Sequence, residues 1–250
     1  MHMERVLEIK DLTISFDGFK AVNNLSTSVK KGDIHFFIGP NGAGKTTLLD
    51  AVCGRVKPLN GSILFKDSSD ITRLSEHQIV EIGIGRKFQV PSVFNGITVY
   101  ENMELAAEKK RSIYSTLFRK LSKEQMERII NVLQTIGLYE KRYRTPASLS
   151  HGEKQWLEIG MLLVQQPEIM LLDEPVAGMG RTETEKTAEL LKQISKVCSV
   201  VVVEHDMEFV RECADTVTVL HEGALLDEGK MTDVQNNPKV IEVYLGRGGE

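Results

Sequence analysis

An apolar run, a glycine-rich loop and a helix follow one another near the N-terminus, and this succession constrains the fold more than any other feature. Ile34–Ile38 predicts a short buried strand, and Thr46–Cys53 predicts a helix that ends at Gly54. The loop between them matches the pattern G-x-x-x-x-G-K-S/T with Gly39-Pro40-Asn41-Gly42-Ala43-Gly44-Lys45-Thr46. A preceding strand and a following helix are the context in which such a loop binds phosphate.

This loop predicts the chemistry of a nucleoside triphosphate site. Its glycines let backbone N–H groups point at phosphate oxygens, and the helix N-terminus adds the positive end of its dipole. Lys45 would place a cation on the β- and γ-phosphates, and the Thr46 hydroxyl would bind Mg²⁺. With Thr47 in the first helical turn, residues 39–47 are predicted to bind ATP. The alternative is a glycine-rich turn that merely joins a strand to a helix, and the agreement of pattern and context disfavours it.

Two adjacent carboxylates indicate that the nucleotide is hydrolysed. Glu168–Leu172 predicts an apolar strand, and Asp173 and Glu174 follow it directly. Such a strand lies beside the phosphate loop in P-loop proteins, so Asp173 would hold Mg²⁺ directly or through water. Glu174 would orient or deprotonate the attacking water as a general base. Acidic pairs at strand ends are common on surfaces, so this prediction depends on its pairing with the phosphate loop.

The rest of the chain alternates strands with helices, which predicts an α/β fold with a mostly parallel sheet covered on both faces. We predict a helix over Thr182–Val197, begun by a capping box of Thr182 and Glu185. Further strands are predicted at Val6–Phe16 before a turn at Asp17-Gly18, and at Ser62–Phe65, Ser199–Val203, Thr216–Leu220 and Ala224–Leu226.

The middle of the chain has a different pattern. Helical spacing runs from Val99 to about Gly137, and Ser122 and Gln125 form a capping box. We therefore expect a single domain over residues 1–250, in which residues 93–149 form a helical subdomain. Residues 1–92 and 150–250 would then form the nucleotide-binding α/β core.

Composition excludes several classes of function. The net charge is −4, so no overall field draws the chain to nucleic acid or to an anionic membrane. No apolar run is long enough to span a bilayer, and no signal-like core follows Met1, so we expect a cytosolic protein. Cys53, Cys198 and Cys213 are widely spaced, which favours reduced structural thiols over a metal or redox site.

A further motif makes a family resemblance visible. Leu149-Ser150-His151-Gly152-Glu153-Lys154-Gln155 resembles the L-S-G-G-Q signature of ABC ATPases. Together with the phosphate loop, Gln89, the acidic pair and His205, it gives a succession of motifs that covers nearly the whole chain. The sequence is identified as a member of the ABC ATPase superfamily. The resemblance implies a P-loop NTPase fold with N-terminal antiparallel strands and an inserted helical subdomain.

The resemblance also implies residue roles. Phe16 would stack on adenine with Val22 nearby, Gln89 would touch Mg²⁺ and the attacking water, and His205 would contact the γ-phosphate. The signature residues Ser150, His151, Gly152 and Glu153 would face the ATP of the opposite subunit. The implied active form is a head-to-tail dimer, either of two copies or with a second ABC ATPase.

Three residues depart from the family pattern. His151 stands where the signature usually has glycine, and Glu153 stands where it usually has glutamine. Gly180 stands where many members have an aspartate that couples the two sites. The details of coupling between subunits are therefore open at these positions.

Several segments resemble importers of the branched-chain amino acid and urea group, among them residues 88–94, 98–102 and 240–246. Residues 149–163, 175–179 and 219–223 look most like ATP-binding proteins of urea transporters. The resemblance implies uptake of urea, with branched-chain amino acids or a non-transport ABC ATPase as alternatives. It also implies transmembrane permease partners that dock near residues 90–101, an indirect periplasmic solute-binding protein and no nucleic acid. The expected location is the cytoplasmic face of the plasma membrane.

Overall fold

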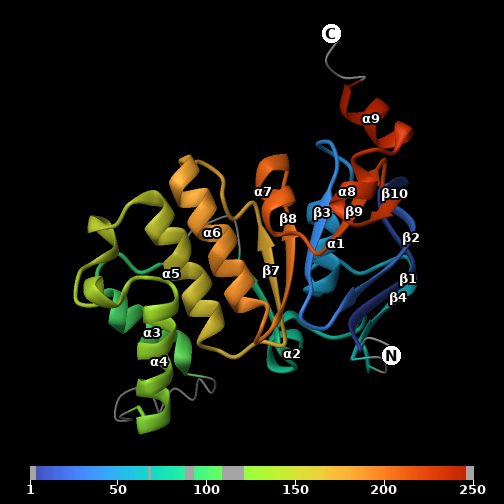
Figure 1. Cartoon of the computed structure of the whole chain (residues 1–250). Coiled ribbons are helices and arrows are strands. Elements are labelled where there is room, and N and C mark those ends of the chain that lie inside the picture. The colour runs from blue at the N-terminus through green and yellow to red at the C-terminus, as the bar shows by residue number, and fades with distance from the viewer. Residues whose placement is uncertain (1–3, 67–68, 88–92, 109–120, 246–250) are drawn as a thin grey trace.

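Strand β3 (Ile34–Ile38) lies inside a six-stranded sheet, as its mostly apolar sequence predicts (Figure 1). The structure is a computed structural model that describes residues 4–66, 69–87, 93–108 and 121–245. The sheet order is β10-β9-β3-β8-β7-β6, in which all neighbours are parallel except β10 and β9. The other strands are β6 (Ile84–Lys87), β7 (Ile169–Asp173), β8 (Ser199–Val203), β9 (Thr216–His221) and β10 (Ala224–Gly229). The predicted, mostly parallel sheet is confirmed.

Successive side chains along these strands alternate between the two faces of the sheet, and each face is covered by a hydrophobic core. Phe36 of β3 packs with the cluster formed by the later helices, whereas Phe37 packs with helix α1 and the N-terminal strands. The same alternation separates Val200 from Val201 in β8. Side chains of successive strand residues point to opposite faces, so a strand that is apolar throughout must be covered on both.

The N-terminal strands form a second, antiparallel sheet of order β2-β1-β4-β5. Strand β1 (Arg5–Phe16) turns at Asp17 and Gly18, which both have positive φ, into strand β2 (Phe19–Lys30). Strand β2 is not among the strands predicted from the sequence. Its buried residues Val22 and Leu25 lie three positions apart because Asn24 has a φ of 50°, which interrupts the alternation. The sheet is completed by β4 (Asn60–Phe65) and β5 (Ser69–Asp70).

Helix α6 begins earlier than the sequence suggested. It spans Arg181–Ile194, and Glu183 at its third position accepts a hydrogen bond from the Gly180 backbone N–H at 3.4 Å. The capping box predicted at Thr182 and Glu185 is therefore wrong, since Glu185 pairs with Arg181 on the exposed face. The remaining helices of the core are α1 (Lys45–Val52), α2 (Glu76–Glu81), α7 (Met207–Cys213), α8 (Met231–Val234) and α9 (Pro238–Leu245).

The described part of the middle of the chain, residues 93–108 and 121–163, forms helices as predicted and lies to one side of the parallel sheet (Figure 1). The Ser122–Gln125 capping box opens α4, and Gly137 follows its end with a φ of 70°. Helix α5 packs against α3 and α4, and a Cβ at Gly160 would lie 2.6 Å from the Ile136 Cδ1 atom. These helices are α3 (Val99–Ala107), α4 (Lys123–Thr135) and α5 (His151–Leu163), with short 3-10 turns at Tyr139–Lys141 and Pro146–Ser148.

Two further features bear on the expectations from composition. Within the described ranges, every helix is too short or too polar to cross a bilayer. Cys53, Cys198 and Cys213 are buried free thiols, and burial raises the pKa of each to about 11 or 12. The three thiols are therefore protonated and inert at neutral pH.

Candidate active site

The predicted catalytic segments meet at one edge of the parallel sheet. The phosphate loop follows β3, Asp173 ends β7, and His205 comes two residues after β8. Because β8 pairs with both β3 and β7, the carboxyl ends of these strands are neighbours. Ligands bind at this edge in open α/β sheets, where the loops converge.

Two glycines of the phosphate loop have backbone positions that no side chain could occupy. Gly39 has a φ of 147°, and a Cβ there would lie 2.2 Å from the Leu220 carbonyl oxygen. Gly44 has a φ of 97°, and a Cβ there would lie 2.3 Å from the Ala21 carbonyl oxygen. The loop therefore packs tightly against β9 and β2. Its outer part remains exposed at Asn41 and Gly42.

The N-terminus of α1 is open to an anion. Gly44 is its N-cap and provides no side-chain cap, so the first backbone N–H groups have no intrahelical acceptor. Thr46 in the first turn is exposed, and Thr47 is half-buried. Free N–H groups and the helix dipole at one point fit a phosphate group.

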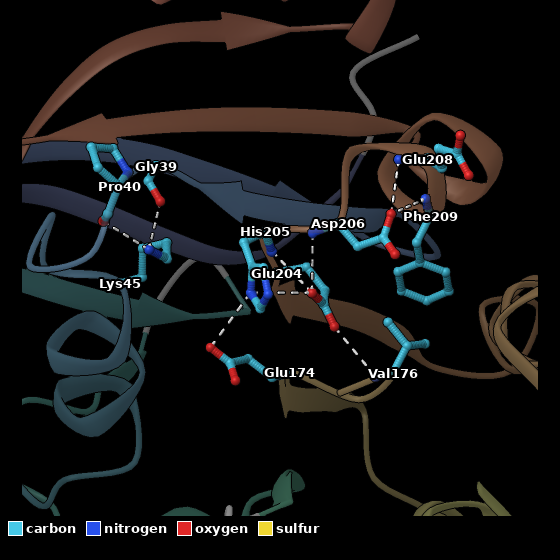
Figure 2. A network of polar contacts seen from close by, with 10 residues as sticks. All are labelled: Gly39, Pro40, Lys45, Glu174, Val176, Glu204, His205, Asp206, Glu208 and Phe209. Atoms are coloured by element: carbon cyan, nitrogen blue, oxygen red, sulfur yellow. Dashed lines mark hydrogen bonds and ion pairs between the residues drawn. The ribbon is translucent and has the colours of Figure 1, made fainter. Parts of the chain in front are cut away.

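Lys45 folds back over the loop, where its Nζ atom donates to the carbonyl oxygens of Gly39 and Pro40 at 2.7 and 3.0 Å (Figure 2). Burial lowers the pKa of Lys45, while the charges of Glu174 and Asp173 act in the opposite direction. The ammonium group thus has only neutral carbonyl partners in its own loop. A phosphate would offer it stronger, charge-assisted hydrogen bonds.

Asp173 is a buried carboxylate that shares the cation of Arg86 with Asp50. Its side chain is 2% exposed, and neither oxygen has a hydrogen-bond partner in the described structure. Arg86 approaches Oδ2 only to 3.6 Å, because its Nη1 atom pairs with Asp50 at 2.5 Å. Burial raises the pKa of Asp173, against the pull of Arg86. Two buried oxygens without donors fit Mg²⁺, and the exposed Thr46 hydroxyl at the start of α1 fits a second ligand.

Glu174 follows Asp173 directly, and its side chain is partly exposed to solvent. It adopts a φ of 47°, and its backbone N–H donates to the Val203 carbonyl at 2.9 Å, which anchors it to β8. Its side chain is 40% exposed, and Oε1 lies 3.7 Å from Nδ1 of His205 (Figure 2). A non-glycine residue with positive φ is strained, and such residues concentrate at functional sites.

A buried carboxylate holds the segment around His205. Oε2 of Glu204 accepts from the backbone N–H groups of His205 and Asp206 at 2.9 and 3.4 Å, and Oε1 accepts from Val176 N–H at 3.3 Å (Figure 2). Burial raises the pKa of Glu204, although these hydrogen bonds oppose the shift. Glu204 is not among the site residues predicted from the sequence. The signal was present, because an acid directly after a buried strand is the same pattern that identified Asp173.

Of the remaining predicted nucleotide contacts, Phe16 is exposed, Val22 is buried and Gln89 lies outside the described residues. Phe16 is 47% exposed at the end of β1, as a ring that stacks on a base must be. Val22 is fully buried, with its Cγ2 atom 3.4 Å from the position of a Cβ at Gly44, so it supports the loop from beneath. Lys87, the last residue of β6, is buried and pairs with Glu158 of α5 at 3.3 Å.

The signature residues form the N-terminus of α5. Ser150 is the N-cap and accepts from the Glu153 backbone N–H at 3.2 Å. Glu153 reaches back to the Ser150 N–H at 3.1 Å and pairs with Lys141, which neutralises this departure from the family pattern. Burial raises the pKa of Glu153, but the hydrogen bonds from Lys141 and from the Ser150 backbone lower it, and the net shift of the pKa is downward.

His151, the other departure within the signature, contacts the segment that follows the acidic pair. Its Nε2 atom lies 3.1 Å from the Ala177 carbonyl oxygen, and the ring lies against Gly178. Gly152 is buried against Glu183 of α6. Between described residues, no hydrogen bond or ion pair joins residues 150–153 to residues 39–47.

Comparison with known proteins gives consistent results. Residues 22–177 match the family model described as ABC transporter, and residues 228–250 match the model of the branched-chain amino acid ATP-binding cassette transporter. The chain is 36% identical to the high-affinity branched-chain amino acid transport ATP-binding protein LivG of Escherichia coli, over 96% of this chain and 98% of LivG. It is 34% identical to the corresponding protein BraF of Pseudomonas aeruginosa, over 96% of this chain and 98% of BraF.

Solved structures agree. The ADP conformation of MJ1267, an ATP-binding cassette of an ABC transporter, superposes with a TM-score of 0.86 at 28% identity and covers 97% of this chain and 99% of MJ1267. The dimeric structure of the cassette MJ0796 has a TM-score of 0.75 at 26% identity and covers 90% of this chain and 98% of MJ0796.

Proposed function

The chain belongs to the ABC transporter family of ATP-binding proteins, and we propose that it powers the uptake of branched-chain amino acids. It is a Mg²⁺-dependent ATPase, the motor of a transporter that works with permease subunits. The observation that supports this solute most strongly is the match of residues 228–250 to the branched-chain amino acid cassette model. Similarity to LivG and BraF along nearly the whole chain supports it as well.

Urea, which the sequence segments favoured, becomes the second candidate. Its support is the likeness of residues 149–163, 175–179 and 219–223 to urea-transporter ATPases, whereas LivG and BraF are named for branched-chain amino acid transport. Because the ATPase subunit does not contact the solute, the choice between the two depends on these sequence likenesses and not on a solute-binding residue.

We propose the following division of labour at the ATP site. Phe16 stacks on the adenine, and residues 39–47 surround the phosphates with backbone N–H groups. Lys45 leaves the carbonyls of Gly39 and Pro40 for the β- and γ-phosphates. Thr46, Asp173 and Gln89 hold Mg²⁺, which when bound supplies positive charge against the phosphate oxygens. The buried oxygens of Asp173, which lack hydrogen-bond donors among the described residues, are the main support for this set.

Hydrolysis is assigned to Glu174 and His205. Glu174 accepts the proton of the attacking water, which can reach its carboxylate because the side chain is 40% exposed. His205, 3.7 Å away, orients this carboxylate and donates to the γ-phosphate as charge develops. Glu204 keeps His205 in place through the backbone. The second half of the site comes from Ser150 and its neighbours in a partner subunit, in a head-to-tail dimer.

A groove beside β6 fits the docking of a permease. It has a volume of about 360 Å³ and lies between α2, β6, α3 and α5. Val80, Phe94 and Leu105 line it with exposed apolar surface, and the Lys87–Glu158 pair lies in the same groove. Lys87 and Phe94, which line it, flank the segment that contains Gln89 in the sequence, and Arg86 in its lining pairs with Asp173, which would place the permease close to the ATP site. Such an arrangement puts the chain on the cytoplasmic face of the membrane.

Uptake of labelled leucine and labelled urea by cells with and without the gene tests the proposal. We expect loss of leucine uptake on deletion, restoration by the parent gene and no restoration by Lys45→Ala. Loss of urea uptake with leucine uptake intact would replace the proposed solute by the second candidate. Unchanged uptake of both would exclude both importers.

A further inference from the structure

The carboxylate of Glu183 lies against the signature of its own chain. Its Oε1 atom accepts a hydrogen bond from the Ser150 hydroxyl at 2.9 Å. A Cβ at Gly152 would lie 2.7 Å from the Glu183 carboxyl carbon, so the carboxylate sits directly on this glycine. Ser150 and Gly152 belong to the signature, which is assigned above to the ATP of a partner subunit and would contact the γ-phosphate of that ATP. A negative group of this chain therefore already lies on both.

The hydroxyl of Ser150 cannot serve two acceptors. It has one hydrogen, which points at Glu183, and it uses a lone pair to accept from the Glu153 backbone N–H. A phosphate oxygen can only accept, so it needs that same hydrogen. In the structure the hydrogen is committed to a carboxylate, which is a strong acceptor.

Glu183 is held where it is by its own helix. Its Oε2 atom accepts from Gly180 N–H at the start of α6. Helices α6 and α5 are also joined by the hydrogen bond from Trp156 Nε1 to Thr187 Oγ1 at 2.9 Å. If the Glu183 carboxylate moves, its hydrogen bond to Gly180 N–H breaks. Residues 177–180 then lose a contact, and His151 of the signature is hydrogen-bonded to the same segment at Ala177.

We propose that Glu183 is a positioning residue that holds the signature in a resting state and competes with phosphate for the Ser150 hydrogen. Closure of the head-to-tail dimer, on whose existence this inference rests, requires Ser150 to exchange Glu183 for the partner's γ-phosphate. The negative charge of Glu183 also opposes the approach of the phosphate. Glu183 therefore raises the ATP concentration at which the dimer closes, without altering ATP binding to the separate subunit.

ATP-driven dimerisation of a Glu174→Gln parent tests this inference, with dimer formation followed by light scattering across an ATP titration. Glu183→Gln removes the charge but keeps a side chain that can cap α6. We expect its half-closure concentration to fall on the order of three- to tenfold, since a charge-assisted hydrogen bond is lost only from the resting state. Affinity for ATP in the monomer, measured at protein concentrations below dimerisation, should not change.

Glu189→Gln is the matched control, because Glu189 is exposed on the same helix and its replacement gives the same change in net charge. It should leave the titration unchanged. Glu183→Ala, which also loses the cap, should unfold at a lower temperature yet close as easily as Glu183→Gln. If the parent dimerises and both Glu183 variants need the same or a higher ATP concentration than the parent for half-closure, the role proposed for Glu183 is wrong. The head-to-tail dimer would still stand. A parent that fails to dimerise at any ATP concentration would overturn the head-to-tail dimer of two copies and, with it, this inference.

Discussion

Oε1 of Glu174 lies 3.7 Å from Nδ1 of His205, although the two residues follow different strands and are far apart in the sequence. The pairing of β7 with β8 creates this proximity. The hydrogen bond from the Glu174 backbone N–H to the Val203 carbonyl holds Glu174 close to β8. The hydrogen bond from the His205 backbone N–H to the Glu204 carboxylate holds His205 in place. The water-activating carboxylate and the histidine thus form a unit that depends on the sheet.

Replacement of His205 by alanine should slow hydrolysis and spare binding. The carboxylate of Glu174 would lose its neighbour, and the developing charge would lose a donor, so kcat should fall on the order of 10²-fold. ATP affinity should stay within about a factor of three of the parent. His77→Ala, on the exposed face of α2, is the control and should turn over at the parent rate. A His205→Ala enzyme with parental kcat would remove His205 from the mechanism.

Lys45→Ala should weaken nucleotide binding rather than stability. The ammonium group leaves two neutral carbonyl acceptors for charged phosphates, so its loss should cost on the order of 10- to 100-fold in ATP affinity. A titration with a fluorescent ATP analogue measures this. Lys196→Ala, at an exposed site, should bind as the parent does. Equal affinity of the two variants would contradict the role given to Lys45.

Gly44→Ala tests the strain argument for the phosphate loop. The new Cβ would lie 2.3 Å from the Ala21 carbonyl oxygen at a φ of 97°, so β2 or the loop must move. We expect a loss of about 1–3 kcal/mol in the free energy of unfolding, together with weaker ATP binding. Gly96→Ala is the control, because a Cβ there meets no atom within 4 Å. Denaturant unfolding of the three proteins gives the comparison, and equal midpoints would refute the steric account.

The buried His35 should make stability depend on pH. Burial lowers its pKa to about 3, whereas an unfolded histidine titrates near 6.5. Between these values the unfolded state binds more protons, so the contribution of His35 is complete above about pH 6.5 and is lost as the pH falls toward 3, by at most about 1.4 kcal/mol per pH unit. His35→Gln should flatten this part of the curve relative to the parent, and His77→Gln should not. Parallel curves for all three proteins would show that His35 is not held neutral.

Strands β3, β7, β8 and β9 could be predicted from the sequence because each is a short run of mostly apolar residues. Strand β6 was not predicted, because two of its four residues, Arg86 and Lys87, are charged. Ile34–Ile38 and Ser199–Val203 need no partner to be recognised, and both were located to the residue. Strand β2 was missed because the positive φ of Asn24 breaks the period of two. The start of α6 was misplaced because its N-cap is Gly180. Glycine has no side chain that could cap the helix, so the sequence shows no Ser, Thr, Asp or Asn at this position.

The active site also has a part that the sequence predicts and a part that it does not. The phosphate loop is contiguous, so a single pattern specifies it. The contacts of Asp173 with Arg86, of Ser150 with Glu183 and of Val176 with Glu204 depend on how separate segments pack. No spacing rule in one sequence reveals such contacts, although an acid after a buried strand was a usable signal for Glu204.

Phosphate release by the Glu174→Gln variant, measured alongside its ATP-dependent dimerisation, tests the central claim most directly. If Glu174 activates water in a site shared by two subunits, the variant binds ATP, releases no phosphate above background and remains a dimer while ATP is present. Asp206→Asn, which changes the carboxylate that caps α7 near the site, serves as a control and should still hydrolyse ATP. Phosphate release by Glu174→Gln at the parent rate would contradict the account.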